Sequence, residues 1–210
     1  MFLLWSSLTL ASNWCDDSSD SIRHTMNVIQ EKLKLDDCTA VLAKIPTLNS
    51  LDISKAEISD IRPLQEAKKM RVLLMNNNMI TDLSAIRTLS LRWLDISYNP
   101  IFDLAPLSKM HSLETLWASF MDVKYVTPLQ GMNNLKYVSL EHNSIRDISV
   151  FSTIKTVEFL GLAQNEIEDF HDLGKHPTLK FISIQGNPVR RCPTKGLWSN
   201  VCKKERERIE

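Results

Sequence analysis

Residues 135–154 read LKYVSLEHNSIRDISVFSTI, and the same pattern recurs along about two thirds of the chain. Apolar residues stand at Leu135, Val138 and Leu140, an asparagine follows at Asn143, and apolar residues then return at every third position. Copies of the pattern are 21 or 22 residues apart and begin at Leu48, Met70, Leu91, Leu113, Leu135, Val157 and Leu179. A fixed period of this length predicts a repeat protein in which each copy forms one coil of a solenoid.

The two halves of each copy predict different local structures. Alternating apolar and polar residues in the first half are typical of a strand with one buried face, and the three-residue step in the second half is typical of a 3₁₀ turn. No single coil can bury its apolar side, so neighbouring coils must stack. Residues 48–189 therefore predict an α/β solenoid of seven leucine-rich repeats, a horseshoe with a parallel β-sheet on its concave face and short 3₁₀ turns on its convex face.

A column of asparagines occupies the turn that follows each strand, at Asn78, Asn99, Asn143, Asn165 and Asn187. A buried polar group left unpaired costs roughly 1–3 kcal/mol, so these amides are expected to bond the backbone of their own turn and of the next coil. We interpret them as a structural asparagine ladder. Ala56 and Met121 occupy the same slot in the two remaining copies, and a looser or reshaped turn is expected at Met121.

Aspartates recur once per coil just before the second half of the repeat, at Asp60, Asp82, Asp103, Asp147 and Asp169. A carboxylate at this position can accept hydrogen bonds from the free amides of a short helical turn. Metal binding would need several of them to converge on one ion, and one residue per coil is too dispersed for that. We interpret them as caps, and we expect neither a metal nor a cofactor.

Both ends of the array depart from the repeat. Within residues 12–47, apolar residues recur at three- and four-residue steps from Ile22 to Leu33, which predicts an amphipathic helix, and a second short helix is expected after Asp36 or Asp37. We expect this segment to form a helical N-terminal cap. Residues 190–210 are expected to form a C-terminal cap, a loop or short helix, that ends in a solvated charged tail from Lys203.

The four cysteines flank the two ends, and none lies inside a coil. The separation of the ends favours the pairs Cys15–Cys38 and Cys192–Cys202 and disfavours a zinc site built from all four. Each closed loop would contribute about 3 kcal/mol by the chain-entropy relation. Such bridges persist in an oxidising compartment, which indicates export.

Residues 1–11 are apolar and resemble the hydrophobic core of a secretory signal without its basic leader. The alternative is an apolar segment that packs on the first coil. The remainder of the chain contains no run of 18 apolar residues, so no membrane span is expected. The 25 basic and 25 acidic residues cancel, and this balance gives no long-range attraction toward nucleic acid.

The spelling Asn-x-Ile-x-Asp-(Ile/Leu)-x-Pro-Leu, seen at residues 99–107 and approximately at 58–64, resembles the internalin-type leucine-rich repeats of bacterial surface and secreted proteins. The flanking cysteines are similar to those of small exported members. The resemblance implies a binding fold with a helical N-terminal cap that holds a protein partner on its concave sheet. It also implies a secreted, periplasmic or cell-surface location in a bacterium.

The third, fifth and seventh residues of each copy are expected to point outward from the sheet, and we call these 21 positions the sheet face. Five of them are aromatic, whereas aromatic residues make up 7% of the chain, and none is lysine or arginine. Aromatic residues favour strands in general, but exposed apolar patches mark interaction sites. The predicted partner-binding residues are Leu74, Trp93, Asp95, Trp117, Tyr137, Glu141, Phe159 and Phe181.

The function predicted from this face is non-catalytic binding of a protein or peptide. An open sheet lacks the closed pocket that a small-molecule substrate needs, and the acidic residues on it would repel nucleic acid. The alternative is an intracellular regulatory scaffold that resembles the leucine-rich-repeat subunit of a serine/threonine phosphatase. Catalysis is disfavoured because the five histidines are scattered, and only His142, beside Glu141, is a candidate.

Overall fold

The computed structural model describes residues 13–196 and 198–208, so the secretory signal expected at residues 1–11 lies outside the described part. Seven parallel strands pair in chain order and form one open sheet. The strands are β1 (Ser50–Asp52), β2 (Val72–Leu74), β3 (Trp93–Asp95), β4 (Thr115–Trp117), β5 (Tyr137–Ser139), β6 (Phe159–Gly161) and β7 (Phe181–Ser183). The expected stacking of seven coils is therefore confirmed.

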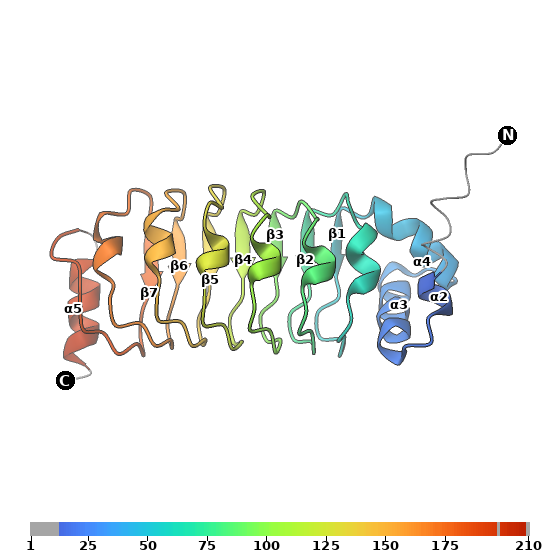
Figure 1. Cartoon of the computed structure of the whole chain (residues 1–210), viewed down its shortest axis with the longest axis horizontal. Helices are drawn as coiled ribbons and strands as arrows, with labels where there is room; N and C mark the ends of the chain where they lie inside the picture. The colour runs from blue at the N-terminus through green and yellow to red at the C-terminus, as the bar shows by residue number, and fades with distance from the viewer. Residues whose placement is uncertain (1–12, 197, 209–210) are drawn as a thin grey trace.

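Short 3₁₀ turns lie opposite the strands in the first six coils, so that the array has a strand side and a turn side (Figure 1). They are η2 (Arg62–Glu66), η3 (Ser84–Ile86), η4 (Ala105–Leu107), η5 (Thr127–Leu129), η6 (Ser149–Ser152) and η7 (His171–Lys175), and η1 (Ile45–Thr47) precedes the first strand. Three of the prolines, Pro63, Pro106 and Pro128, lie in the first turn of these elements, where a missing amide hydrogen leaves no bond unmade.

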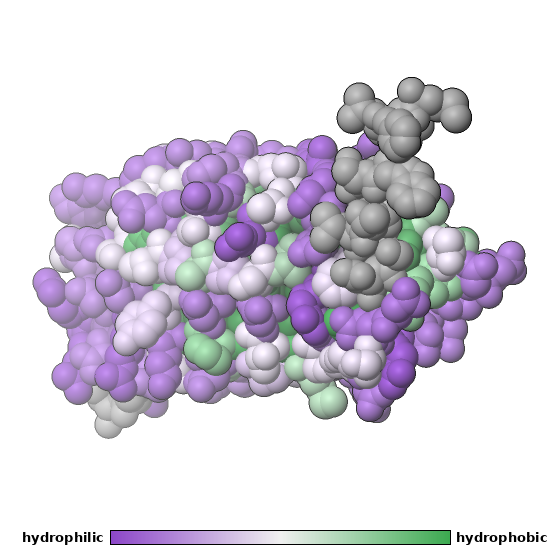
Figure 2. All heavy atoms as spheres, turned by 45° about the vertical axis from the view of Figure 1, so that its right-hand side comes forward, coloured by the Kyte–Doolittle hydropathy of each residue, from purple (hydrophilic) through white to green (hydrophobic). Residues whose placement is uncertain are grey.

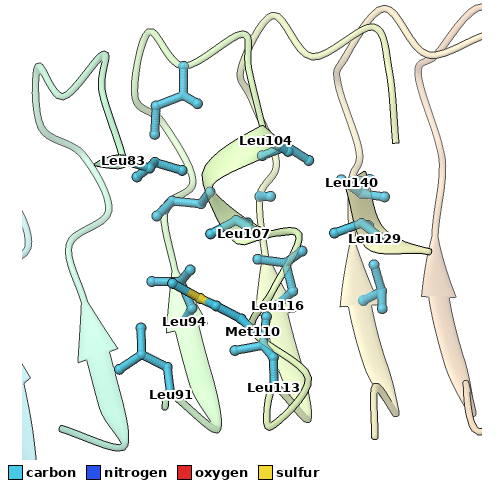
Figure 3. Packing of buried hydrophobic residues seen from close by; sticks show 14 of the residues in the cluster. Leu83, Leu91, Leu94, Leu104, Leu107, Met110, Leu113, Leu116, Leu129 and Leu140 are labelled. Carbon is cyan, nitrogen blue, oxygen red and sulfur yellow. The ribbon is translucent and has the colours of Figure 1, made fainter. Parts of the chain in front are cut away.

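The core is the space between the strands and the 3₁₀ turns. Leucines from neighbouring coils, among them Leu94, Leu107 and Leu116, fill it (Figure 3), and all three are fully buried. Phe151 occupies the same core in the fifth coil with no exposed surface. Because each coil supplies apolar residues at the same positions, the core runs as one column from end to end.

The asparagine ladder binds neighbouring coils together. Asn143 is typical: its Nδ2 donates to the carbonyl oxygens of Leu140, in its own turn, and of Ala118, in the preceding coil, both at 2.9 Å. Its Oδ1 accepts the amide of Val123 at 3.0 Å. Each side chain thus bonds the backbone of two coils in a buried position, which explains why an amide is needed there.

The coil that carries Met121 keeps the turn of its neighbours, so the expectation of a looser or reshaped turn was wrong. Phe120, the residue before it, has φ 56°, close to the values of Tyr98 and His142 at the same position in the adjacent coils. The difference lies in the hydrogen bonds that an asparagine side chain would make. The amide of Ile101, which finds no asparagine in the next coil, donates instead to the carbonyl of Asn99 at 2.8 Å.

The five repeating aspartates cap the turns as the sequence predicts. Each accepts the amide of the residue two positions later, at 2.8–3.0 Å. At Asp147 the hydrogen bond from the Ser149 amide lowers the pKa of the carboxyl group, with a second contribution from the Ser149 hydroxyl.

We expect Asp147→Asn to flatten the acid dependence of stability. A carboxyl group whose pKa is lowered on folding stabilises the protein above its unfolded pKa, and this contribution is lost as the pH falls through the lowered folded pKa. Asparagine keeps the acceptor oxygen and removes the titration. Thermal unfolding between pH 7 and pH 3 should therefore show a shallower fall in Tm for the variant, and an identical fall would contradict the capping role.

Three helices cover the first coil and are blue in Figure 1: α2 (Asn13–Asp16), α3 (Asp20–Leu33) and α4 (Cys38–Lys44). Helix α3 buries Ile22, Met26 and Ile29 in the core, and the hydroxyl of Thr25 donates to the carbonyl of Asp60 in the first coil. The apolar end of the column is thus shielded from water by a helix, as the spacing of these residues predicts.

The other end is covered by helix α5 (Ser199–Glu207). The charged segment from Lys203 is largely exposed, as expected, but it is helical rather than frayed, because the helix includes most of it. Glu205 is only 7% exposed, and its Oε1 accepts the amide of Gly186 in the last coil at 2.9 Å. This carboxylate accepts the hydrogen bond that a backbone carbonyl of the next coil accepts elsewhere in the array, as at His142.

Both expected disulfides are present, Cys15–Cys38 and Cys192–Cys202, and they close loops of 23 and 10 residues. Cys15 and Cys38 join helix α2 to the start of helix α4, while Cys192 and Cys202 join the last coil to α5. Each bridge therefore fastens a cap, and neither lies within the stack of coils.

Candidate functional site

The strand register places the predicted partner-binding residues on one shared surface. Thr115 pairs with Tyr137, Tyr137 with Phe159, and Phe159 with Phe181, so three aromatic rings occupy adjacent coils in one column. Trp93 lies in the same column, and Trp117 lies one column over, paired with Asp95 on the neighbouring strand. Residues far apart in the sequence thereby become neighbours across the sheet.

Most of these aromatic side chains reach solvent. Trp93, Trp117, Tyr137 and Phe181 are between 37% and 47% exposed, and Phe159 and Leu74 are half-buried. Asp95 is different, because only 6% of it is exposed. Its carboxylate accepts the Asn76 side chain at 2.7 Å and the Ser97 amide at 3.0 Å, so this side chain, unlike the rings, does not point freely into solvent.

The exposed rings pack against one another in pairs. Trp93 and Trp117 meet edge to face with their centroids 5.3 Å apart, and Phe159 and Phe181 stack at 4.7 Å. Such pairs contribute roughly 0.5–1.5 kcal/mol beyond the area that they bury. The rings are therefore held in place before any partner arrives, which lowers the entropy that binding would cost.

A second set of rings was not foreseen as a unit. Tyr98, Phe120 and His142 follow the strands at the same position of three successive coils and stack with centroid distances of 4.3 and 4.0 Å. All three have a left-handed backbone, with φ between 53° and 56°. We call them the ring column. All three stand at the same position of their repeats, one residue before the asparagine slot, and this regularity in the sequence could have predicted the column.

Between the ring column and the aromatic side chains of the sheet lies a recess of about 420 Å³. Its lining combines aromatic rings with hydroxyl, amide and carboxylate groups and contains no lysine or arginine. The lining residues are Asn76, Asn77, Asp95, Ser97, Tyr98, Trp117, Ser119, Phe120, Ser139, Glu141 and Phe159. The recess thus combines aromatic surface with acidic, hydrogen-bonding groups.

Glu141 reaches across the sheet because Gly161 has no side chain. The hydroxyl of Ser183, two coils away, donates to its Oε1. A Cβ added at Gly161 would lie 3.2 Å from the Glu141 side chain, so a larger residue there would push the carboxylate aside. Among the described residues, the second oxygen, Oε2, accepts no hydrogen bond.

The opposite border of the sheet, where the strands begin, is charged rather than aromatic. One charged residue stands there in each of six coils: Arg71, Arg92, Glu114, Lys136, Glu158 and Lys180. Arg92 pairs with Glu114 at 2.7 Å and Lys180 with Glu158 at 2.6 Å, and the hydrogen bond from Lys180 lowers the pKa of Glu158. The border where the strands begin therefore carries paired charges of both signs, whereas the recess contains carboxylates and no basic group.

Three of the histidines contact backbone groups or another ring. The ring nitrogens of His176 contact the Ile154 carbonyl and the Leu179 amide, and burial lowers the pKa of this side chain. His24 contacts the carbonyl of Ala56, and His142 stacks on Phe120 as described. Within residues 13–196 and 198–208, no cluster of three potential metal ligands occurs, and no helix is long and apolar enough to cross a membrane.

Known structures of the same architecture include bacterial and animal proteins. An internalin, InlF, of Listeria monocytogenes superposes with a TM-score of 0.70 at 21% identity, over 85% of this chain and 59% of its own length. The fold is that of the leucine-rich repeat. Internalin C2 of the same species gives 0.63 at 21% identity, over 79% and 84% of the two chains. The Toll–Spätzle complex of Drosophila gives 0.65 at 20% identity, over 73% and 24%.

This leucine-rich-repeat chain spans less than two thirds of InlF, and the similarity concerns the fold alone. No protein-family model matches the chain, and no curated protein matches it in sequence. The surface around the cap is largely hydrophilic with small apolar areas between (Figure 2). Because they are exposed and packed against one another, the rings of the sheet face and the ring column are the leading candidate site.

Proposed function

We propose that this protein is an exported, non-catalytic binding module that holds a protein or peptide partner on its sheet face. The observation that carries the proposal is the row of partly exposed, mutually packed rings on one open sheet. Aromatic anchors of this kind are enriched in the energetic centres of protein interfaces. The solved structure of the Toll–Spätzle complex, which shares the fold, is a structure of a protein–protein complex.

The face has the dimensions of a modest interface. Seven strands about 4.8 Å apart, each exposing about 17 Å, present roughly 500 Å², somewhat less than the 800 Å² or so that each partner of a standard complex buries. Binding must therefore depend on a few well-placed rings rather than on area.

Replacing both Trp117 and Phe159 with alanine should abolish capture of the native partner from an extracellular fraction, with a fall in affinity of about 100-fold or more if both are hot spots. The matched control is Phe102→Ala/Tyr125→Ala, which removes two rings that are 66% and 74% exposed but lie outside the recess and the sheet face. Retention of the partner by the first variant, or its loss with the control, would contradict binding through the sheet face.

Export is supported by the two disulfides, which need an oxidising compartment. Thiol titration of the native protein, unfolded without reductant, should find no free thiol. Four free thiols would instead favour the alternative of an intracellular regulatory scaffold.

A further inference from the structure

We infer that the recess receives a basic side chain, lysine or arginine, from an extended segment of the polypeptide partner. This inference rests on the proposed function and adds the chemistry of the partner. It places the side chain beside Glu141, between the rings of Trp117 and Phe159 on one side and of Tyr98 and Phe120 on the other.

Charge is the first reason. The recess contains the carboxylates of Asp95 and Glu141 and no basic group, although the whole chain is neutral. Two carboxylates among low-polarity aromatic side chains give the recess a negative potential, which attracts cations and repels anions. An acidic or phosphorylated segment would be excluded there.

The walls are the second reason. An ammonium or guanidinium group is attracted to the face of an aromatic ring within about 6 Å of its centre. The long aliphatic stems of lysine and arginine also pack well on apolar surfaces while their charged ends remain hydrogen-bonded. A recess lined by both rings and a carboxylate satisfies both parts of such a side chain.

The placement of Glu141 is the third reason. Its Oε1 is fixed by the hydroxyl of Ser183, and the absent side chain of Gly161 leaves room for its carbon chain. Oε2 accepts no hydrogen bond from the described residues, so an incoming donor finds an oriented acceptor with an open position. Asp95, which is buried and bonded to Asn76 and Ser97, contributes charge without direct contact.

The test measures the binding of fluorescently labelled octa-arginine and octa-glutamate by anisotropy at pH 8, where histidine is neutral. The wild-type protein should bind octa-arginine and not octa-glutamate, and Glu141→Gln should weaken the binding by about tenfold because one partner of a close charge pair is lost. Glutamine can still accept the Ser183 hydroxyl, so the local structure is kept. Asp52→Asn, an exposed carboxylate of the same face on β1, is the matched control and should bind as the wild type does.

Three outcomes would overturn the inference: no binding of octa-arginine, equal weakening by Asp52→Asn and Glu141→Gln, or displacement of octa-arginine by the neutral sugar maltohexaose. The last result would assign the recess to carbohydrate. If Trp117→Ala/Phe159→Ala still loses the native partner while Glu141→Gln has no effect on octa-arginine, the proposed function stands and the basic side chain is ruled out. If the alanine variant retains the native partner, the proposed function itself fails.

Discussion

Replacement of Asn143 by alanine should lower the free energy of unfolding by about 2–4 kcal/mol, because two buried backbone groups lose their partners. These groups are the amide of Val123 and the carbonyl of Ala118, both of which bond the Asn143 side chain. The third partner, the carbonyl of Leu140, is less affected, since it also accepts the Nδ2 of Asn165. Urea denaturation followed by circular dichroism measures the change.

The ladder supplies its own comparison. Asn165→Ala deprives the Ile145 amide of its partner. The carbonyls of Leu140 and Leu162 each keep a neighbouring asparagine, Asn143 or Asn187, and the carbonyl of Ala163 keeps the amide of His142. Asn165→Ala should therefore cost less than Asn143→Ala by about 1–3 kcal/mol, the penalty of one orphaned group. Equal costs for the two variants would contradict this distribution of bonds.

Met121 is the reason for the difference and offers a rescue. An asparagine would put an amide group where it could bond the Ala118 carbonyl and the Ile101 amide, which now bonds the carbonyl of Asn99. We expect Met121→Asn to recover about 1 kcal/mol or more when it is combined with Asn143→Ala. Failure to recover any stability would show that the side chain of residue 121 does not reach the ladder.

Removal of the bridge at the N-terminal cap should have an effect of similar size. Cys15→Ser/Cys38→Ser opens a loop of 23 residues, and the chain-entropy relation predicts a loss of about 3 kcal/mol. Because helix α3 covers the core with Ile22, Met26 and Ile29, loosening of this cap exposes the first coil to water. Hydrogen exchange should therefore rise first in β1 and fall off along the array.

The wild-type protein in reductant is the control for this variant. Its midpoint of urea denaturation should shift by more than that of the variant, since reduction opens both bridges. A variant that unfolds at the same urea concentration as the oxidised wild type would show that packing of α3 alone holds the cap.

The repeat made the coil, the sheet, the ladder and the capping aspartates predictable, because each residue type recurs at the position where one backbone requirement recurs. The disulfide pairs were predictable for a related reason: the two ends of a stacked array are far apart. The burial of Asp95 was not, since it depends on the side chain of Asn76 in another coil. The two residues of such a contact belong to different copies of the repeat, so the pattern within one copy cannot predict it.

Two further features escaped sequence analysis for local reasons. The mixed charges after Lys203 indicated solvent, but one of them, Glu205, bonds the amide of Gly186 and holds a helix against the last coil. His142 was considered only with its neighbour in sequence, Glu141, whereas its ring stacks on Phe120 in the preceding coil. In both cases the partner lies about 20 residues away, one repeat along the chain.

Because both bridges fasten the caps and none crosses the stack, the number of coils is free to change. Inserting or deleting one whole copy would lengthen or shorten the display surface by a single strand spacing, about 4.8 Å. The helical caps and their disulfides at the two ends would not change. In such a scaffold, engineering or evolution can change the length of the sheet by whole repeats without redesigning either cap.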